Sequence, residues 1–219
     1  MSGQSPPDEF AVTDAVAEVA RERTALLVVD MQKAFMQSTS SLSQVGLDPE
    51  RLRPAIPGTL QLVEAARRAN VPRIFTRYVY LPGMADFGPV RTRRSALRRQ
   101  IGSLAFGSTE SELLDELRVE DDEFIIDKSR PSAFYGTRLE PLLRSLGTQA
   151  LVVCGVTTNI CVETTVRDAG QRDYDTFVAR DAVAEYSDSR HNHALEAIAW
   201  TFGQVVSVRD VVLAWTDDT

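Results

Sequence analysis

The chain alternates short apolar runs with segments in which apolar residues recur at helical spacing. An apolar run of roughly four to eight residues between turn residues is typical of a strand buried on both faces, as in a parallel sheet. Helical segments between such runs can supply the crossover connections that parallel strands require. We therefore predict strands at residues 24–30, 73–80, 124–127, 151–153, 174–179 and 204–206.

The segments between these strands are predicted to be mainly helical. Helices are expected at residues 13–23, 58–70, 111–117, 137–146, 188–202 and 208–215, and a further helix is expected around Val162, Val166 and Ala169. Four segments lack a clean period: 31–44 is predicted to be a loop or lid, 47–57 and 81–89 to be turn-rich, and 180–182 to be an acidic turn. The alternation predicts an α/β fold in which helices cover both faces of a mostly parallel sheet.

The composition is that of a globular α/β domain. The chain has 219 residues, of which 43% are hydrophobic, so one domain with its own core is the natural interpretation. We assign residues 23–219 to this domain and residues 1–22 to an N-terminal extension or short helix. The formal net charge of −7 argues against nucleic-acid binding, although it leaves an anionic substrate possible.

Cysteine usage and hydropathy bear on the compartment. The two cysteines, Cys154 and Cys161, lie in one short segment and form no disulfide framework, which favours a reducing cytoplasm over secretion. No apolar run approaches the ~20 residues that a membrane helix needs. The opening MSGQSPPDEF also lacks the basic and then apolar layout of a secretory signal. We therefore expect a cytoplasmic protein that does not contact a membrane.

Three reactive side chains follow predicted strands: Asp30, Lys128 and Cys161. Because the carboxyl ends of parallel strands meet at one edge of the sheet, these side chains can converge in a single crevice. Each also has an ordinary explanation. An Asp or Lys after a strand is often a solvated loop residue, and a free cysteine often packs as a small hydrophobic group. We interpret Cys154, at the end of its strand, as core packing.

Together the three side chains would suit nucleophilic catalysis. Cys161 is expected in the first turn of a helix, where unpaired N–H groups and the helix dipole favour thiolate over thiol. Asp30 could take the proton, and Lys128 could favour the charged forms of both neighbours. The thiolate would then attack a carbonyl carbon. The backbone N–H groups of Thr157 and Cys161 could stabilise the oxyanion, although Thr157 and Thr158 could instead simply cap the helix.

Three segments resemble the isochorismatase-like cysteine hydrolase family: TALLVVDMQKAF, IIDKSRPSAFYGT and VVCGVTTNICVETTVRDAGQRDY. The resemblance extends over residues 24–206, and GVTTNICV is its most specific part. It implies a Rossmann-like three-layer αβα sandwich with a parallel six-stranded sheet. It also implies the Asp30, Lys128 and Cys161 triad of the amidases, and a non-proline cis peptide before Thr157 that aims its N–H into the oxyanion hole.

The resemblance also narrows the chemistry. Nicotinamidases of the family bind a metal through an aspartate and histidines after the second strand, where this chain has RYVY at residues 77–80. His191 and His193 lie far along the chain and, two residues apart, do not share a helix face, so we interpret them as surface or helix-end residues. The resemblance therefore implies no metal and no cofactor.

The family contains more than one reaction. The presence of Cys161 and the segment KSRPSAFYGT favour cleavage of a C–N bond in a small linear amide, carbamoyl or ureido compound. Two alternatives stay open: isochorismatase-type cleavage of a vinyl ether with Asp30 as the acid, and a non-catalytic family member that acts as a binding protein.

Five side chains are candidates for contact with a small-molecule substrate. Phe35 and Tyr135 could form walls of the pocket, and Arg77 and Tyr80 end the second predicted strand near the crevice. Arg130 could pair with a substrate carboxylate through two parallel hydrogen bonds. For each of the five, ordinary packing or a structural salt bridge is the alternative.

A run of positive charge stands out between residues 91 and 100, which contain five arginines. A solvated face or a contact between subunits is favoured over an anion site, because charge runs are usually solvated. The resemblance implies a homo-oligomer, either a dimer or a tetramer, and this run is one possible contact.

Overall fold

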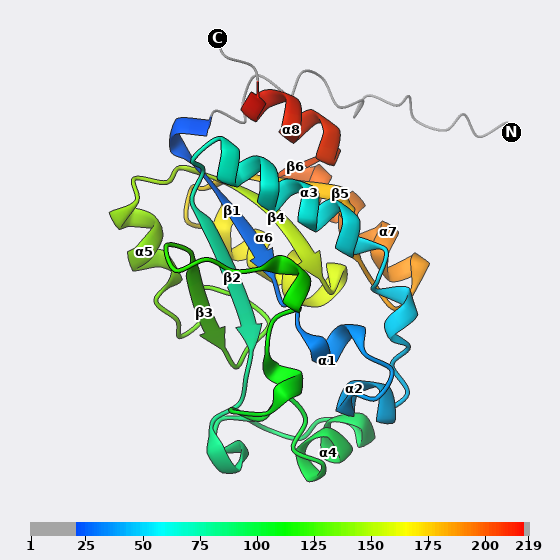
Figure 1. The fold of residues 1–219 in the computed structure, drawn as a ribbon. Coiled ribbons are helices and arrows are strands. Elements are labelled where there is room, and N and C mark those ends of the chain that lie inside the picture. Colours follow the sequence, from blue (N-terminus) through cyan, green and yellow to red (C-terminus); the bar gives the residue numbers. More distant parts are fainter. Residues whose placement is uncertain (1–20, 217–219) are drawn as a thin grey trace, which may run out of the picture.

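Six parallel strands form one sheet in the computed structural model, which describes residues 21–216 (Figure 1). The strand order is β3-β2-β1-β4-β5-β6, so β1 and β4 lie at the centre. The expected parallel six-stranded sheet is confirmed. The strands are β1 (Thr24–Val29), β2 (Arg73–Tyr78), β3 (Phe124–Lys128), β4 (Ala150–Val156), β5 (Asp175–Ala184) and β6 (Gln204–Val206).

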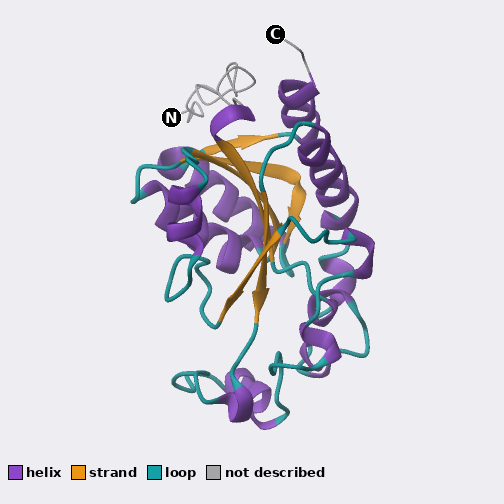
Figure 2. Cartoon of the chain, turned by 60° about the vertical axis from the view of Figure 1, so that its left-hand side comes forward, coloured by secondary structure: helices purple, strands orange, loops and turns teal. Residues whose placement is uncertain are grey.

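Helices pack on both faces of the sheet and make it the middle of three layers (Figure 2). Helices α3 (Ala55–Arg68) and α8 (Val208–Thr216) bury their apolar residues in one core cluster. Helices α5 (Leu139–Ser145) and α6 (Glu163–Gly170) do so in a second cluster on the other face. Successive side chains of a strand point to opposite faces. Leu26 and Val28 of β1 accordingly lie in the first cluster, and Leu27 and Val29 in the second.

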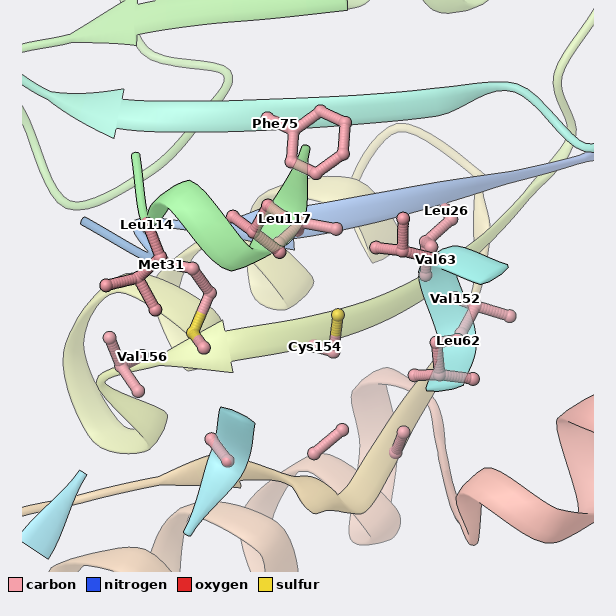
Figure 3. Close-up of a cluster of buried hydrophobic side chains, with 14 of the residues drawn as sticks. Leu26, Met31, Leu62, Val63, Phe75, Leu114, Leu117, Val152, Cys154 and Val156 are labelled. Carbon is pink, nitrogen blue, oxygen red and sulfur yellow. The ribbon is translucent and has the colours of Figure 1, made fainter. Parts of the chain in front are cut away.

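The first cluster explains Cys154. Its side chain is fully buried beside Phe75, Leu62 and Val152, as Figure 3 shows. Burial raises the pKa of the Cys154 thiol to about 12, which keeps it protonated. The interpretation of Cys154 as core packing is confirmed.

Strand β5 is longer than the sequence pattern predicts. The pattern places an acidic turn at residues 180–182, but the strand continues to Ala184 after a shift in its register with β4. The turn prediction is wrong because Val183 and Ala184 resume the pairing with β4, opposite Gly155 and Val156. Asp181, whose charge suggested a turn, instead accepts a hydrogen bond from the Val208 N–H at the start of α8 (2.8 Å).

Several helix boundaries also differ from the prediction. The segment 31–44 contains two one-turn helices, α1 (Lys33–Met36) and α2 (Ser41–Gln44), too short to show a helical period. Helix α3 begins at Ala55, because Pro57 falls in its first turn, where a missing N–H is tolerated. The predicted helix at 111–117 is two 3₁₀ turns (Thr109–Ser111 and Asp115–Leu117). The helix at 188–202 is α7 (Asp188–Ala197) followed by a π-helical turn (Ile198–Phe202).

The arginine run forms helix α4 (Arg93–Gln100), which begins with a capping box between Thr92 and Ser95. Helix α4 lies with α1 and α2 beyond the carboxyl ends of β1 and β2 (Figure 1). This is the edge of the sheet at which α/β proteins bind ligands. The helix predicted at residues 13–23 lies mostly outside the described residues, which begin with a 3₁₀ turn at Arg21–Arg23.

Candidate active site

Asp30 lies directly after β1, where the backbone turns into the left-handed region (φ 50°) that Asp tolerates better than most residues. The side chain is completely buried. Thr76 on β2 fixes it from both sides: its Oγ1 accepts a hydrogen bond from the Asp30 N–H (3.1 Å) and donates one to Oδ1 (2.6 Å). The carboxylate is thus held at the carboxyl edge of the sheet.

Lys128 is the last residue of β3, and its side chain is also fully buried. Its Nζ lies 2.6 Å from the Asp30 Oδ2 and 3.2 Å from the Arg130 carbonyl oxygen. The same Nζ is 4.3 Å from the centroid of the Tyr78 ring. Burial lowers the pKa of Lys128, but its interactions with Asp30 and, second, with Cys161 outweigh this effect, so the pKa lies above its ordinary value. We therefore treat Lys128 as a permanent ammonium ion.

Cys161 follows β4, after a turn that brings the chain close to β1. Gly155 has a φ of +108°, and a Cβ there would collide with the Val29 backbone, so this close approach of the two strands requires glycine. The peptide bond between Val156 and Thr157 is cis, as the resemblance implies. Cys161 then lies in a π-helical turn (Thr158–Val162) that leads into α6, and 4% of the residue is exposed.

The three side chains meet. Asp30 and Lys128 lie close enough to the Cys161 thiol to shift its pKa. Burial is the largest influence on Cys161 and raises its pKa to about 12, while Lys128 opposes this rise and Asp30 adds to it. The expectation that the helix start favours thiolate is therefore wrong for the resting state. The main reason is the burial of the thiol; in addition, Asp30 already balances the charge of Lys128, so a thiolate would add a second buried anion.

This pKa predicts slow and strongly pH-dependent alkylation of Cys161. At pH 7, iodoacetamide is expected to react at least about tenfold more slowly than with free cysteine, because only the thiolate is nucleophilic. The rate should rise about tenfold per pH unit up to pH 10, whereas that of free cysteine levels off near pH 9. Peptide mapping by mass spectrometry separates Cys161 from Cys154. Rapid labelling of Cys161 at pH 7 would contradict the raised pKa.

A cleft of about 260 Å³ lies next to Lys128, because Tyr78 and Arg130 of its lining both contact the Lys128 ammonium group. It is lined by two of the predicted substrate-binding residues, Tyr80 and Arg130, and also by Tyr78, which contacts Lys128. A larger hollow of about 520 Å³ lies at the start of β5 and β6, at the opposite edge of the sheet, and its lining does not include Tyr78 or Arg130, the two residues that contact Lys128. The smaller cleft is therefore the candidate substrate site.

The other three predicted substrate contacts do not line this cleft. Arg77 is held by Asp127 through two hydrogen bonds of 2.7 and 2.9 Å, on neighbouring strands. Phe35 is buried in the first core cluster. Tyr135 is 67% exposed and lines a separate hollow beside Arg130. Arg77 thus forms a structural salt bridge and Phe35 packs in the core, which are the alternatives stated for them from the sequence.

Three polar residues support the site but were not singled out in the sequence. Thr76 orients Asp30, and the Tyr78 ring covers Lys128. Gln32 is completely buried and accepts a hydrogen bond from the Tyr78 N–H (2.7 Å), while its Nε2 donates to the Ser111 carbonyl (2.8 Å). The sequence offered one signal for these residues: each is a polar residue inside or just after an apolar strand. A buried polar group needs a hydrogen-bond partner, so such a residue indicates a polar contact with another part of the chain.

The turn before Cys161 has its own polar contacts. The Thr157 side chain makes no capping hydrogen bond. The Thr158 Oγ1 lies 2.9 Å from the His191 Nδ1, so the two residues pair with each other. His191 is therefore partly buried against the turn, whereas His193 is exposed on α7. The alternative that both threonines simply cap the helix is not supported by these contacts.

Metal-ligating clusters and membrane-spanning helices are both absent from the described part of the chain. Among residues 21–216, His, Cys, Asp and Glu side chains do not gather in any group of three or more that could hold a metal ion. Within the same residues, no helix is both long and apolar enough to cross a membrane.

A buried thiol, carboxylate and ammonium group beside a cleft, at the carboxyl edge of a parallel sheet, suit a hydrolase with a cysteine nucleophile. The isochorismatase domain matches residues 24–210, so the chain belongs to the isochorismatase family. This confirms the resemblance stated from the sequence.

Two ureidoacrylate amidohydrolases are similar in sequence to this chain. The chain is 34% identical over 199 residues to a ureidoacrylate amidohydrolase of Pantoea ananatis, covering 85% of this chain and 80% of that relative. The corresponding protein of Serratia proteamaculans is 33% identical over 222 residues, covering 94% and 89%.

Two solved structures are also similar. A cysteine hydrolase from Pseudomonas syringae pv. phaseolicola 1448A has a TM-score of 0.75 at 29% identity, covering 89% of this chain and 93% of that one. An N-carbamoylsarcosine amidase from Thermoplasma acidophilum has a TM-score of 0.65 at 26% identity, covering 85% and 96%.

Proposed function

We propose that this protein is a cysteine amidohydrolase that cleaves a C–N bond in a small linear amide, carbamoyl or ureido compound. The observation that carries the proposal is the single buried cluster of Cys161, Asp30 and Lys128 beside the cleft. The names of the similar ureidoacrylate amidohydrolases and N-carbamoylsarcosine amidase agree with this type of reaction.

The chemistry begins with a proton transfer. The Cys161 thiol passes its proton to the Asp30 carboxylate while its sulfur attacks the carbonyl carbon of the substrate. The thiol pKa of about 12 makes this coupling necessary, because few thiolates exist in the resting protein. The N–H groups of Thr157 and Cys161 are proposed to stabilise the tetrahedral oxyanion.

The second half regenerates the thiol. Asp30 returns the proton to the leaving nitrogen, the C–N bond breaks, and a thioester with Cys161 remains. Asp30 then takes a proton from water, the hydroxide attacks the thioester carbonyl, and the proton returns to the departing sulfur. Lys128 stays an ammonium ion throughout and balances the charge that moves between Asp30 and Cys161.

The wider assignments are part of the same proposal. Residues 23–219 form the hydrolase domain and residues 1–22 an extension; the family match over residues 24–210 supports the first part. We infer that the protein acts on a small molecule in the cytoplasm, without nucleic acid or membrane, as a homo-oligomer. Its free cysteines and acidic net charge of −7 support the compartment and the lack of nucleic acid.

The test is a screen for ammonia release from ureido acids, carbamoyl amino acids, biuret, nicotinamide and simple amides. Ammonia from a member of the ureido or carbamoyl groups supports the proposal. Pyruvate from isochorismate without ammonia from any amide would support vinyl-ether cleavage with Asp30 as the acid. Binding without release of either product would indicate the non-catalytic alternative.

A further inference from the structure

The wall of the candidate cleft is positively charged. Its lining includes Arg91, Arg98 and Arg130 and contains no Asp or Glu. This contrasts with the whole chain, in which acidic residues outnumber basic ones by 31 to 24. Three guanidinium groups without a lining carboxylate give the cleft a local field opposite in sign to the net charge, which favours an anionic ligand.

These arginines lack the partners that other arginines have. Arg67, Arg73 and Arg77 each form an ion pair with a carboxylate. Among residues 21–216, none of the three cleft arginines has a carboxylate oxygen within 4.0 Å. Paired charges are the usual condition for an arginine that is partly removed from water.

Arg98 is the most informative of the three. Its Nε is buried and has no hydrogen-bond partner in the described structure. Its guanidinium carbon lies 6.0 Å from the centroid of the Phe87 ring, another residue of the cleft. An unsatisfied buried donor is destabilising, and a ligand that accepts its hydrogen bond removes that cost. Arg98 therefore presents an unused donor in the cleft.

A row of aromatic rings in the cleft extends from the side of Arg98 to Lys128. Tyr78, Tyr80 and Phe87 pack in a row, with ring centroids 5.3 and 4.6 Å apart. Burial, followed by Tyr80, raises the pKa of Tyr78; Cys161 adds to the rise and Arg98 opposes it. Tyr78 lines the cleft with Arg98 and its ring also contacts Lys128, so the cleft connects Arg98 with the edge of the buried cluster.

We propose that Arg98 binds a carboxylate on the substrate, at the end away from the carbonyl that Cys161 attacks. Arg91, at the exposed mouth, and Arg130 add positive charge beside it. Nη1 of Arg130 already donates to the Asp86 and Ser129 carbonyls (both 2.7 Å), so its main role is to hold the loop that forms the cleft. Resting on the proposed amidohydrolase function, this inference makes Arg98 the residue that selects, among acyclic amide and ureido compounds, those that carry a carboxylate.

The assignment revises the interpretation of the arginine run. The run was expected to be a solvated face or a subunit contact rather than an anion site. Arg93, Arg94 and Arg99 are exposed and do not line the cleft, which agrees with a solvated face for that side of α4. Arg98 and Arg91 of the same run line the cleft. The run therefore has two faces with different roles.

The test compares two substrates of matched shape: 3-ureidopropionate, and isopentylurea, in which two methyl groups replace the carboxylate oxygens. Ammonia release gives the ratio of kcat/KM for the two. The wild-type protein should favour the anion at least tenfold. Arg98→Gln should reduce that preference at least tenfold, mainly through KM, and Arg98→Lys should restore part of it. Arg99→Gln removes the same charge from the exposed face of α4 and should keep the wild-type preference.

Equal turnover of both compounds by the wild-type protein, or an equal loss of preference in Arg99→Gln, would overturn the role of Arg98 and leave the amidohydrolase proposal standing. If neither compound releases ammonia, calorimetry with 3-ureidopropionate separates the two proposals. Binding to Cys161→Ala that is lost in Cys161→Ala/Arg98→Gln supports the carboxylate site without the proposed reaction. No binding to Cys161→Ala overturns the carboxylate site.

Discussion

Replacing Cys161 by alanine is expected to lower ammonia release by at least about a thousandfold while the protein stays folded. The sulfur is the atom that forms the thioester, and Asp30 and Lys128 have no substitute nucleophile beside them in the proposed mechanism. The side chain is small, so its loss leaves the contacts between Lys128 and Asp30 in place. Single-turnover and steady-state ammonia assays measure the effect, with circular dichroism as the check on folding.

The matched control is Cys154→Ala. Cys154 is also a buried free thiol with a pKa raised to about 12, but it lies in the core on β4, away from the cleft. This change should cost about 1 kcal/mol of stability and leave turnover within severalfold of wild type at moderate temperature. Unchanged hydrolysis in Cys161→Ala, or an equal loss of hydrolysis in both variants, would contradict the assigned nucleophile.

Lys128→Met is expected to lower the free energy of unfolding by about 3–5 kcal/mol and to abolish turnover. The change keeps an unbranched side chain that lacks only the terminal ammonium position, but it leaves the Asp30 carboxylate buried without its ammonium partner, since both side chains are fully inaccessible. Urea denaturation followed by circular dichroism measures the loss. Adding Asp30→Asn should recover part of the stability, because it removes the unpaired charge, yet the double variant should stay inactive.

The Arg77–Asp127 pair offers the control for this prediction. It joins β2 and β3 one residue before Lys128, but its side chains are 29% and 40% exposed. Arg77→Met should therefore cost no more than about 1 kcal/mol, as is usual for exposed ion pairs. A loss in Lys128→Met as small as that in Arg77→Met would contradict the view that the buried pair is a stabilising unit.

The pH dependence of the buried pair follows from the raised pKa of Lys128. A lysine whose pKa is higher in the folded state contributes its full stabilisation below the unfolded value of 10.5. That contribution is lost only as the pH rises through the still higher folded pKa. The part of the difference in unfolding free energy between wild type and Lys128→Met that comes from the titration of Lys128 should therefore stay constant from pH 6 to pH 9.

The sequence predicted the sheet and the meeting of the three reactive residues because both follow from local patterns. Strands buried on both faces leave continuous apolar runs, and parallel strands bring their carboxyl ends to one edge. Asp30, Lys128 and Cys161 could therefore be grouped without coordinates. The positions of Thr76 and Tyr78 relative to them depend on the pairing of β2 with its neighbours, which no local pattern specifies.

The errors have a common cause. The thiolate expectation for Cys161 considered the helix start but not the burial of the whole cluster, which dominates the pKa. The substrate role of Arg77 considered only its place near the strand end, whereas the side chain pairs with Asp127 on the next strand. The turn at 180–182 was inferred from charge alone. Each of these features depends on contacts between residues far apart in the chain.

The strand order has a consequence for which residue can occupy position 128. Strand β2 lies between β1 and β3, so the Lys128 side chain, the Asp30 side chain and the 2.6 Å contact between them together bridge two strand spacings, about 9–10 Å. A shorter cationic side chain, such as ornithine or diaminobutyrate introduced synthetically, would carry the same charge and still fall short. The requirement at this position is therefore one of reach as well as charge, and it is set by the width of the intervening strand.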